Sequence, residues 1–201
     1  MTIFNTSSNY GSIAKLLHWT TAGTFIGAYI IVYYVIWFMD DTKPESLPFL
    51  NVHWALGIIA GVLIIPRMIW RMLNIRPADP AGSAWEHRLA HWAHFLLYGL
   101  LIAMPLTGYL GTGADTNFGL FSVQGFNSSS SFALISRIWG VSWQEFEVPM
   151  DVVHHFLGKW VGWSVVGLHV FAALYHHAVR HDEVLLRMLP FRKINETTKE
   201  S

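Results

Sequence analysis

The histidines are the residues of this chain whose type and spacing are best suited to chemistry. There are eleven of them and no cysteine, which excludes disulfides, iron–sulfur clusters and thioether attachment of a haem. His155 and His169 are fourteen residues apart, so on one α-helix they would share a face and lie about 21 Å apart. One imidazole near each surface of a membrane is the arrangement that two stacked haems require.

His53 is the expected partner of His155, because both open apolar segments at the same predicted depth. His154 would point about 60° away from the shared stripe of an uninterrupted helix, so we prefer His155 as the ligand. The sequence therefore predicts one haem held by His53 and His155.

The partner of His169 stays open on spacing alone. His18, His91 and His94 all begin apolar segments at its depth, and depth favours His18 only slightly. Arg67 falls at the same level, and a guanidinium there would cost a few kcal/mol unless paired. A haem propionate would be a suitable bidentate partner for Arg67.

Three glycines lie on the same faces of the predicted helices as these histidines. Gly57 and Gly61 follow His53 by one and two turns, and Gly162 lies midway between His155 and His169. Two interpretations are equally favoured: close approach of a flat macrocycle, or packing of small residues between helices.

The composition places these residues in a membrane. Apolar residues make up 53% of the chain and charged residues 13%, and four segments have the roughly 20 apolar residues that a span needs. The predicted fold is all-α, a single-domain four-helix membrane bundle enclosing two haems. The expected spans are residues 13–38, 52–73, 90–110 and 152–179, with a long outer loop, 111–151, that contains a short helix near 132–139.

The basic residues predict the orientation. Most of them lie at the N-terminus, in the connector 74–88 or in the C-terminal tail, whereas acidic residues gather on the other side. Positive residues favour the cytoplasmic side, so both termini are expected to face the cytoplasm. The basic set is Lys15, Arg67, Arg71, Arg76, Arg88, Arg180, Arg187, Arg192, Lys193 and Lys199. The net charge of zero gives no reason to expect a nucleic-acid partner.

Zinc is the main rival metal. A zinc site needs three or four ligands at one point. Two histidine triplets could supply them or relay protons, although ordinary hydrated histidines at the membrane surface are as good an explanation. These triplets are His87, His91 and His94, and His176, His177 and His181.

The motifs together are similar to those of a known family. They are Leu17-His18-Trp19, His53 with Gly57 and Arg67/Arg71, Ala90-His91 with His94, Tyr98, Pro105 and Gly108, and the block from His155 through Gly167-Leu168-His169 and His176-His177 to Leu186-Arg187-Met188-Leu189-Pro190. The chain resembles the prokaryotic di-haem cytochrome b561 family, and within it the superoxide oxidase type.

The resemblance implies two haems b, one ligated by His18 and His169 and the other by His53 and His155. It implies a multi-pass protein of the bacterial inner membrane that oxidises superoxide on the periplasmic side and reduces ubiquinone, with no protein partner required. His176, and with it His177 and His91, are then candidates for the quinone and proton site.

In one respect, the charge near the site of the electron donor, the chain departs from the superoxide oxidase type. An anion such as superoxide needs positive potential, yet the first outer loop has three carboxylates and one lysine. Lys159 is the best remaining attractor. The alternative function is a haem b membrane-anchor subunit of a hydrogenase-type or dehydrogenase-type complex.

Overall fold

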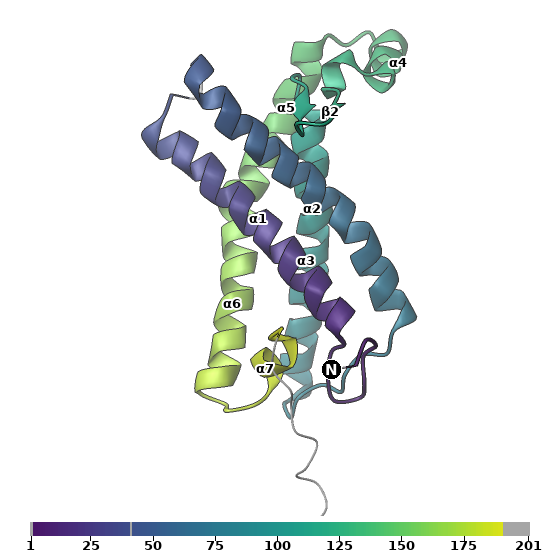
Figure 1. Ribbon diagram of the computed structural model, residues 1–201, viewed down its shortest axis with the longest axis vertical. Coiled ribbons are helices and arrows are strands. Elements are labelled where there is room, and N and C mark those ends of the chain that lie inside the picture. Colours follow the sequence, from purple (N-terminus) through teal and green to yellow (C-terminus); the bar gives the residue numbers. More distant parts are fainter. Residues whose placement is uncertain (1, 41, 191–201) are drawn as a thin grey trace, which may run out of the picture. The chain divides into compact units, whose positions relative to one another are not determined.

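Four long helical segments dominate the computed structural model, which describes residues 2–40 and 42–190 (Figure 1). Each is long and apolar enough to cross a membrane, which confirms the predicted all-α class with four spans. The first three are α1 (Ser12–Phe38), α2 (Leu47–Leu73) and α3 (Ala84–Leu110). The fourth runs through α5 (Trp143–Phe156), a π-helical turn, η3 (Leu157–Gly162), and α6 (Trp163–Ala178).

Three spans begin at least five residues earlier than predicted: α2 at Leu47, α3 at Ala84 and the fourth helix at Trp143. A short 3₁₀ turn, η1 (Pro44–Ser46), leads into α2. The fourth helix begins at Trp143, inside the predicted loop, where the Ser142 side chain accepts from the Glu145 amide and the Glu145 carboxylate accepts from the Ser142 amide. Such a capping box satisfies donors that would otherwise be exposed at the helix start.

The remaining outer segment is compact rather than extended. A two-residue hairpin, β1 (Thr116–Asn117) with β2 (Ser122–Val123), is followed by η2 (Phe126–Ser128) and α4 (Ser130–Trp139). Gly140 ends α4 with φ +68°, a conformation suited to glycine. The short helix predicted near 132–139 is thus present.

The chain divides into two compact units, and each is described by itself. The first contains Met1–Thr20, Ile65–Leu97 and Ser164–Ser201, and the second contains Thr21–Ile64 and Tyr98–Trp163. In the second unit an aromatic cluster forms the core of the outer segment, where Phe126 and Phe132 each lie 5.5 Å from Phe146 between ring centroids.

Many large apolar side chains remain exposed on the helices, among them Ile30, Val62 and Leu106. An exposed apolar surface of this kind is expected of helices that face hydrocarbon. Asp41, one of the three carboxylates of the first outer loop, and the basic tail residues Arg192, Lys193 and Lys199 lie outside the described residues.

Candidate haem sites

In the first unit, three imidazole rings from different helices meet around His169. Its ring centroid lies 6.2 Å from that of His18 on α1 and 6.1 Å from that of His94 on α3. We call these three residues the His169 cluster. The structure therefore brings together His169 and two of the three partners that spacing left open.

The third candidate, His91, makes a different contact. Its Nε2 lies 3.2 Å from Nη2 of Arg76, and the side chain is exposed. An arginine can only donate, so the Nε2 of His91 is used as an acceptor. This contact leaves His18 and His94 as the candidate partners of His169.

Arg67 lies directly beside the His169 cluster. Its Nη2 donates to Nδ1 of His18 at 3.1 Å. A neutral imidazole that binds iron through Nε2 carries its proton on Nδ1, so haem binding would require Arg67 to leave this nitrogen. His94 differs, because its Nδ1 already donates to the carbonyl oxygen of Ala90 at 2.7 Å.

A carboxylate not singled out from the sequence holds His176. Nδ1 of His176 lies 2.5 Å from Oδ2 of Asp182, and both side chains are 24% exposed. The other carboxylate oxygen of Asp182 accepts from the amide of Val184, and the amide of Asp182 donates to the carbonyl oxygen of His176. Asp182 thereby connects the end of α6 to the start of α7 (Val184–Met188).

The charge state of Asp182 follows from these contacts. Partial burial would raise its pKa, but the hydrogen bond from His176, the Val184 amide and the nearby Arg180 together outweigh burial and lower it. Asp182 is therefore ionised near neutral pH. His177, the neighbouring candidate, is exposed.

The same corner of the first unit is fastened by further polar contacts. Lys15 donates through Nζ to the carbonyl oxygen of Leu189 at 3.0 Å, and Trp19 donates through Nε1 to that of Met188 at 2.8 Å. Because both donors lie on α1, α7 is anchored to the helix that carries His18.

In the second unit, His53 faces His154. The two ring centroids are 6.2 Å apart and the planes are nearly perpendicular, at 82°. His155, the predicted partner of His53, is exposed, and its ring centroid lies 6.4 Å from that of His154. The structure therefore brings the neighbour of the predicted ligand toward His53.

Both facing histidines are oriented by backbone carbonyls. Nδ1 of His53 lies 3.0 Å from the carbonyl oxygen of Ala28, and Nδ1 of His154 lies 3.1 Å from that of Met104 and 3.2 Å from Oγ1 of Thr107. A carbonyl oxygen can only accept, so Nδ1 carries the proton in each ring and Nε2 keeps its lone pair. Metal-ligating histidines are typically held in this way.

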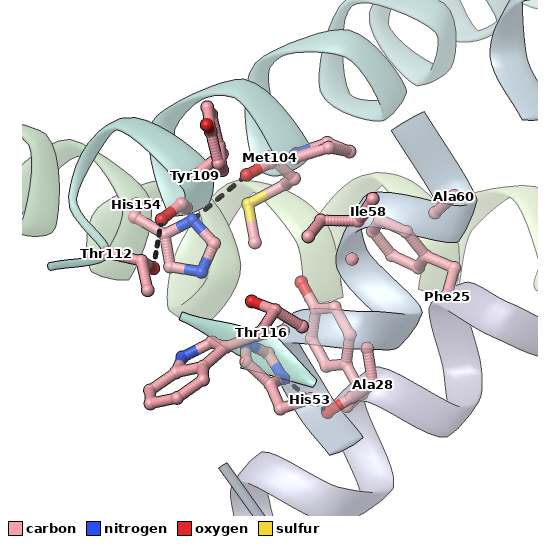
Figure 2. Close-up of a pocket in the computed structure, with 15 residues that line it drawn as sticks. Phe25, Ala28, His53, Ile58, Ala60, Met104, Tyr109, Thr112, Thr116 and His154 are labelled. Carbon is pink, nitrogen blue, oxygen red and sulfur yellow. Dashed lines mark hydrogen bonds between the residues drawn. The ribbon is translucent and has the colours of Figure 1, made fainter. Parts of the chain in front are cut away.

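His53 and His154 line one cavity, which we call the His53 cavity (Figure 2). Phe25, Ile58 and Tyr109 contribute to its mainly apolar wall. Apolar walls with two imidazoles and open Nε2 atoms fit a flat, hydrophobic macrocycle whose iron takes axial nitrogen ligands.

The glycines divide between the two proposed roles. Gly57 lines the His53 cavity, and a Cβ added there would have no other atom within 4 Å. Gly61 instead packs against Pro105, and a side chain at Gly162 would overlap the hydroxyl of Tyr29. Gly57 thus leaves room in the cavity, whereas Gly61 and Gly162 allow helices to approach closely.

Neither histidine triplet forms a zinc centre in the described part of the chain. No three His, Asp or Glu side chains converge there on a point that could hold a metal ion.

Lys159, the candidate outer attractor for an anion, lies in the π-helical turn. Its Nζ is 5.4 Å from the ring centroid of Trp160, and both side chains are exposed. The ammonium is thus available to solutes but is not part of the His53 cavity lining.

Comparison with known proteins agrees with this chemistry. The family model for the prokaryotic cytochrome b561 matches residues 9–191. Among individual relatives, cytochrome b561 homolog 2 of Escherichia coli (strain K12) is 30% identical, covering 94% of this chain and 95% of its own length. Cytochrome b561 homolog 1 of the same organism is 28% identical over 88% and 94% of the two chains.

A third relative has a name that includes an activity. It is the probable superoxide oxidase CybB of Yersinia pestis, which is 29% identical over 71% of this chain and 75% of its own. The family match covers almost all of the described residues, including every histidine of both sites. This chain belongs to the prokaryotic cytochrome b561 family and is therefore a membrane electron-transfer protein that binds haem b.

Proposed function

We propose that this protein carries electrons between an outer donor and the membrane quinone pool through two haems b, as a superoxide:ubiquinone oxidoreductase. One observation carries the proposal: each compact unit contains a histidine pair with ring centroids 6.2 Å apart, His18 with His169 and His53 with His154. Since a metal–imidazole bond is about 2 Å long, two rings on opposite sides of one iron have centroids about 6 Å apart.

The first haem would be held by the His169 cluster, with His18 and His169 as axial ligands. His94 lies as close to His169 as His18 does, so resemblance rather than distance favours His18. Arg67, once released from His18, would pair with a propionate. The second haem would fill the His53 cavity, with His53 as one ligand and one of the adjacent His154 and His155 as the other.

Haem b supplies a reversible one-electron couple when bound. Two histidines per haem would leave no position on the iron for oxygen and would restrict the haem to electron transfer. Two superoxide anions would each give one electron and leave as dioxygen. Ubiquinone would take both electrons with two protons and become ubiquinol.

The protons would enter near His176. Its Nδ1 donates to the ionised Asp182, so Nε2 would take up a proton and, in the resulting imidazolium, donate it to a quinone oxygen. His177 and His91 are further candidates for moving protons between this site and the cytoplasm.

The outer donor would be attracted by Lys159. In the first outer loop Lys43 lies 3.6 Å from Asp40, so its charge is partly neutralised. The basic residues of the connector 74–88 and the tail support an orientation with both termini in the cytoplasm. Reporter fusions at each terminus would test that orientation.

The test uses the purified full-length chain in detergent or liposomes. Superoxide should reduce ubiquinone only when the haem-loaded protein is present, and His176→Phe should lower the rate about 100-fold while keeping the haem content. Failure of superoxide to reduce the haems, or co-purification with an iron–sulfur subunit that does reduce them, would contradict the proposed donor. The second result would instead indicate a membrane anchor.

A further inference from the structure

We infer that the turn of the outer hairpin between β1 and β2, residues Phe118–Phe121, is a membrane anchor whose apolar side chains insert among the lipids at the outer ends of the spans. We call these four residues the hairpin tip. The inference needs only that the chain spans a membrane, so it goes beyond the proposed electron transfer and does not depend on it.

The hairpin tip exposes apolar side chains to an unusual degree. Leu120 is 99% exposed and Phe121 is 62% exposed. The ring of Phe118 is stacked on that of Phe121, with centroids 5.0 Å apart and planes inclined by 11°. Adjacent exposed apolar side chains of this kind mark a surface that contacts lipid or another protein.

The conformation of the hairpin tip is fixed by hydrogen bonds. The amide of Phe118 donates to the carbonyl oxygen of Phe121 at 2.9 Å, and the amide of Gly119 donates to Oδ1 of Asn117 at 2.6 Å. Gly119 has φ +85°, a conformation that favours glycine. These contacts hold the turn in a form that leaves Leu120 and Phe121 on its outside.

Asn51 on α2 determines the depth of the hairpin relative to the membrane. Its Nδ2 donates to the carbonyl oxygen of Asn117 at 2.9 Å, and its Oδ1 accepts from the amide of Asn117 at 2.7 Å. Asn51 directly precedes Val52, where the predicted apolar span begins. The pair of hydrogen bonds therefore holds the hairpin at the level where α2 passes from the headgroups into hydrocarbon.

The surroundings of the hairpin tip favour lipid as its occupant. Leu47, one helical turn before Asn51, and Val52 are exposed apolar residues of α2, so the tip continues an apolar surface that already faces the membrane. The tip contains no charged residue and two aromatic ones, and aromatic side chains are enriched at the boundary between bilayer and water.

Insertion of the hairpin tip would also hold one wall of the His53 cavity in place. Thr116, which precedes Asn117 in β1, is buried and lines that cavity (Figure 2). The hairpin is thus attached to α2 through Asn51, to the cavity through Thr116 and to the lipid through Leu120 and Phe121.

The experiment uses the absence of cysteine from the chain, because a single introduced thiol then reports one position. Leu120→Cys is compared with Gln144→Cys and Val62→Cys in the full-length protein, in nanodiscs of phosphatidylethanolamine and phosphatidylglycerol that hold one chain each. All three positions are exposed in the structure. Gln144 is the aqueous control, about 12 Å before Val152 along the fourth helix, and Val62 is the control within α2.

The rate of reaction with a polyethylene glycol maleimide is measured by gel shift and normalised to the rate in denaturing detergent. Leu120→Cys should react about tenfold more slowly than Gln144→Cys, because a thiol in an apolar environment does not ionise. Val62→Cys should be protected at least as strongly. Equal rates for Leu120→Cys and Gln144→Cys would overturn the proposal and would indicate a protein partner for the hairpin tip instead.

A second substitution separates lipid insertion from a slow reaction of other origin. Phe121→Asn, added to Leu120→Cys, should raise the labelling rate several-fold, because it removes the second apolar side chain of the anchor. Val148→Asn is the matched control, since Val148 is an exposed apolar residue of α5 outside the tip, and it should leave the rate unchanged. Protection of Leu120→Cys that persists in full with Phe121→Asn would contradict insertion of the tip.

Discussion

The hydroxyl of Tyr29 on α1 donates a hydrogen bond to the carbonyl oxygen of Gly158, at 2.9 Å, within the π-helical turn. A π turn disturbs the regular hydrogen bonds of a helix, and a side chain from a neighbouring helix can satisfy the carbonyl that is left over. Trp163, just after the turn, donates through Nε1 to the hydroxyl of Tyr33 at 2.9 Å. Two tyrosines of α1 therefore hold the π-helical turn and the first residue of α6.

The close approach of the Tyr29 hydroxyl to Gly162 predicts that Gly162→Ala is destabilising. A methyl group at this position would overlap the Tyr29 hydroxyl, and overpacking of this kind costs about 1–3 kcal/mol. Tyr29→Phe in the same chain should recover part of the loss, because it removes the overlapping atom. Thermal unfolding in detergent measures both variants.

Gly167→Ala is the matched control, because a side chain there meets no atom within 4 Å. Alanine favours a helix over glycine by up to about 1 kcal/mol, so this variant should be neutral or stabilising. Equal stability of Gly162→Ala and the wild type would show that the close approach of Tyr29 is unimportant.

A large side chain at Gly57 should exclude haem from the His53 cavity. Gly57 lines the cavity, and a Cβ at this position meets no atom within 4 Å, so Gly57→Leu should place its side chain in the cavity and still fold. We expect a loss of about one haem per chain. Gly23→Leu, at another uncrowded helical glycine of the same unit, should retain full haem content. Normal haem content in Gly57→Leu would argue against this cavity as a haem site.

Asp182 should make stability depend on pH. Its pKa is lowered in the folded protein. The contribution of Asp182 to the free energy of unfolding is therefore fully present above its unfolded pKa of about 3.9, and it is lost as pH falls through its lower folded pKa. Asp182→Asn should cost about 1 kcal/mol at neutral pH, through the lost charged partner of His176 and the lost support of α7. The difference in stability between Asp182→Asn and the wild type should become smaller below about pH 4.

Thermal unfolding of both proteins across this pH range measures the effect. Asp79→Asn, at an exposed carboxylate of the same unit, is the control. A gap between wild type and Asp182→Asn that widens as pH falls would contradict the assigned direction.

The features that follow from local composition were the predictable ones. Four apolar segments gave four helices, and equal depth along them brought His18, His94 and His169 together. Arg67 was expected at that depth and lies against His18. These predictions needed only the regular rise of an α-helix.

The features that depend on an irregular backbone or on tertiary contacts were not predictable. The π turn at Leu157–Gly162 has no signature in hydropathy, and it disturbs the helical phase that ranked His155 above His154. Asp182 follows His176 by six residues across a turn in which His181 has φ +52°, so no helical spacing relates the pair. A carboxylate just after a histidine-rich helix end was the only available signal.

Arg67 should raise the reduction potential of the haem at the His169 cluster, because a nearby positive charge favours the more negative ferrous state. Arg67→Met should lower that potential by about 60 mV, a tenfold change for a one-electron couple. The potential of the other haem should change much less. A redox titration followed in the α-band region measures both, and an unchanged pair of potentials would contradict a role for Arg67 at a haem.

The most direct test is the number of haems per chain in the purified wild type, His53→Ala and His169→Ala. We expect about two in the wild type and about one in each variant, with different α-bands lost from the two spectra, because we propose that each histidine binds a separate haem. An absence of haem from the wild type would contradict the account. So would a full complement in either variant, or loss of the same band from both.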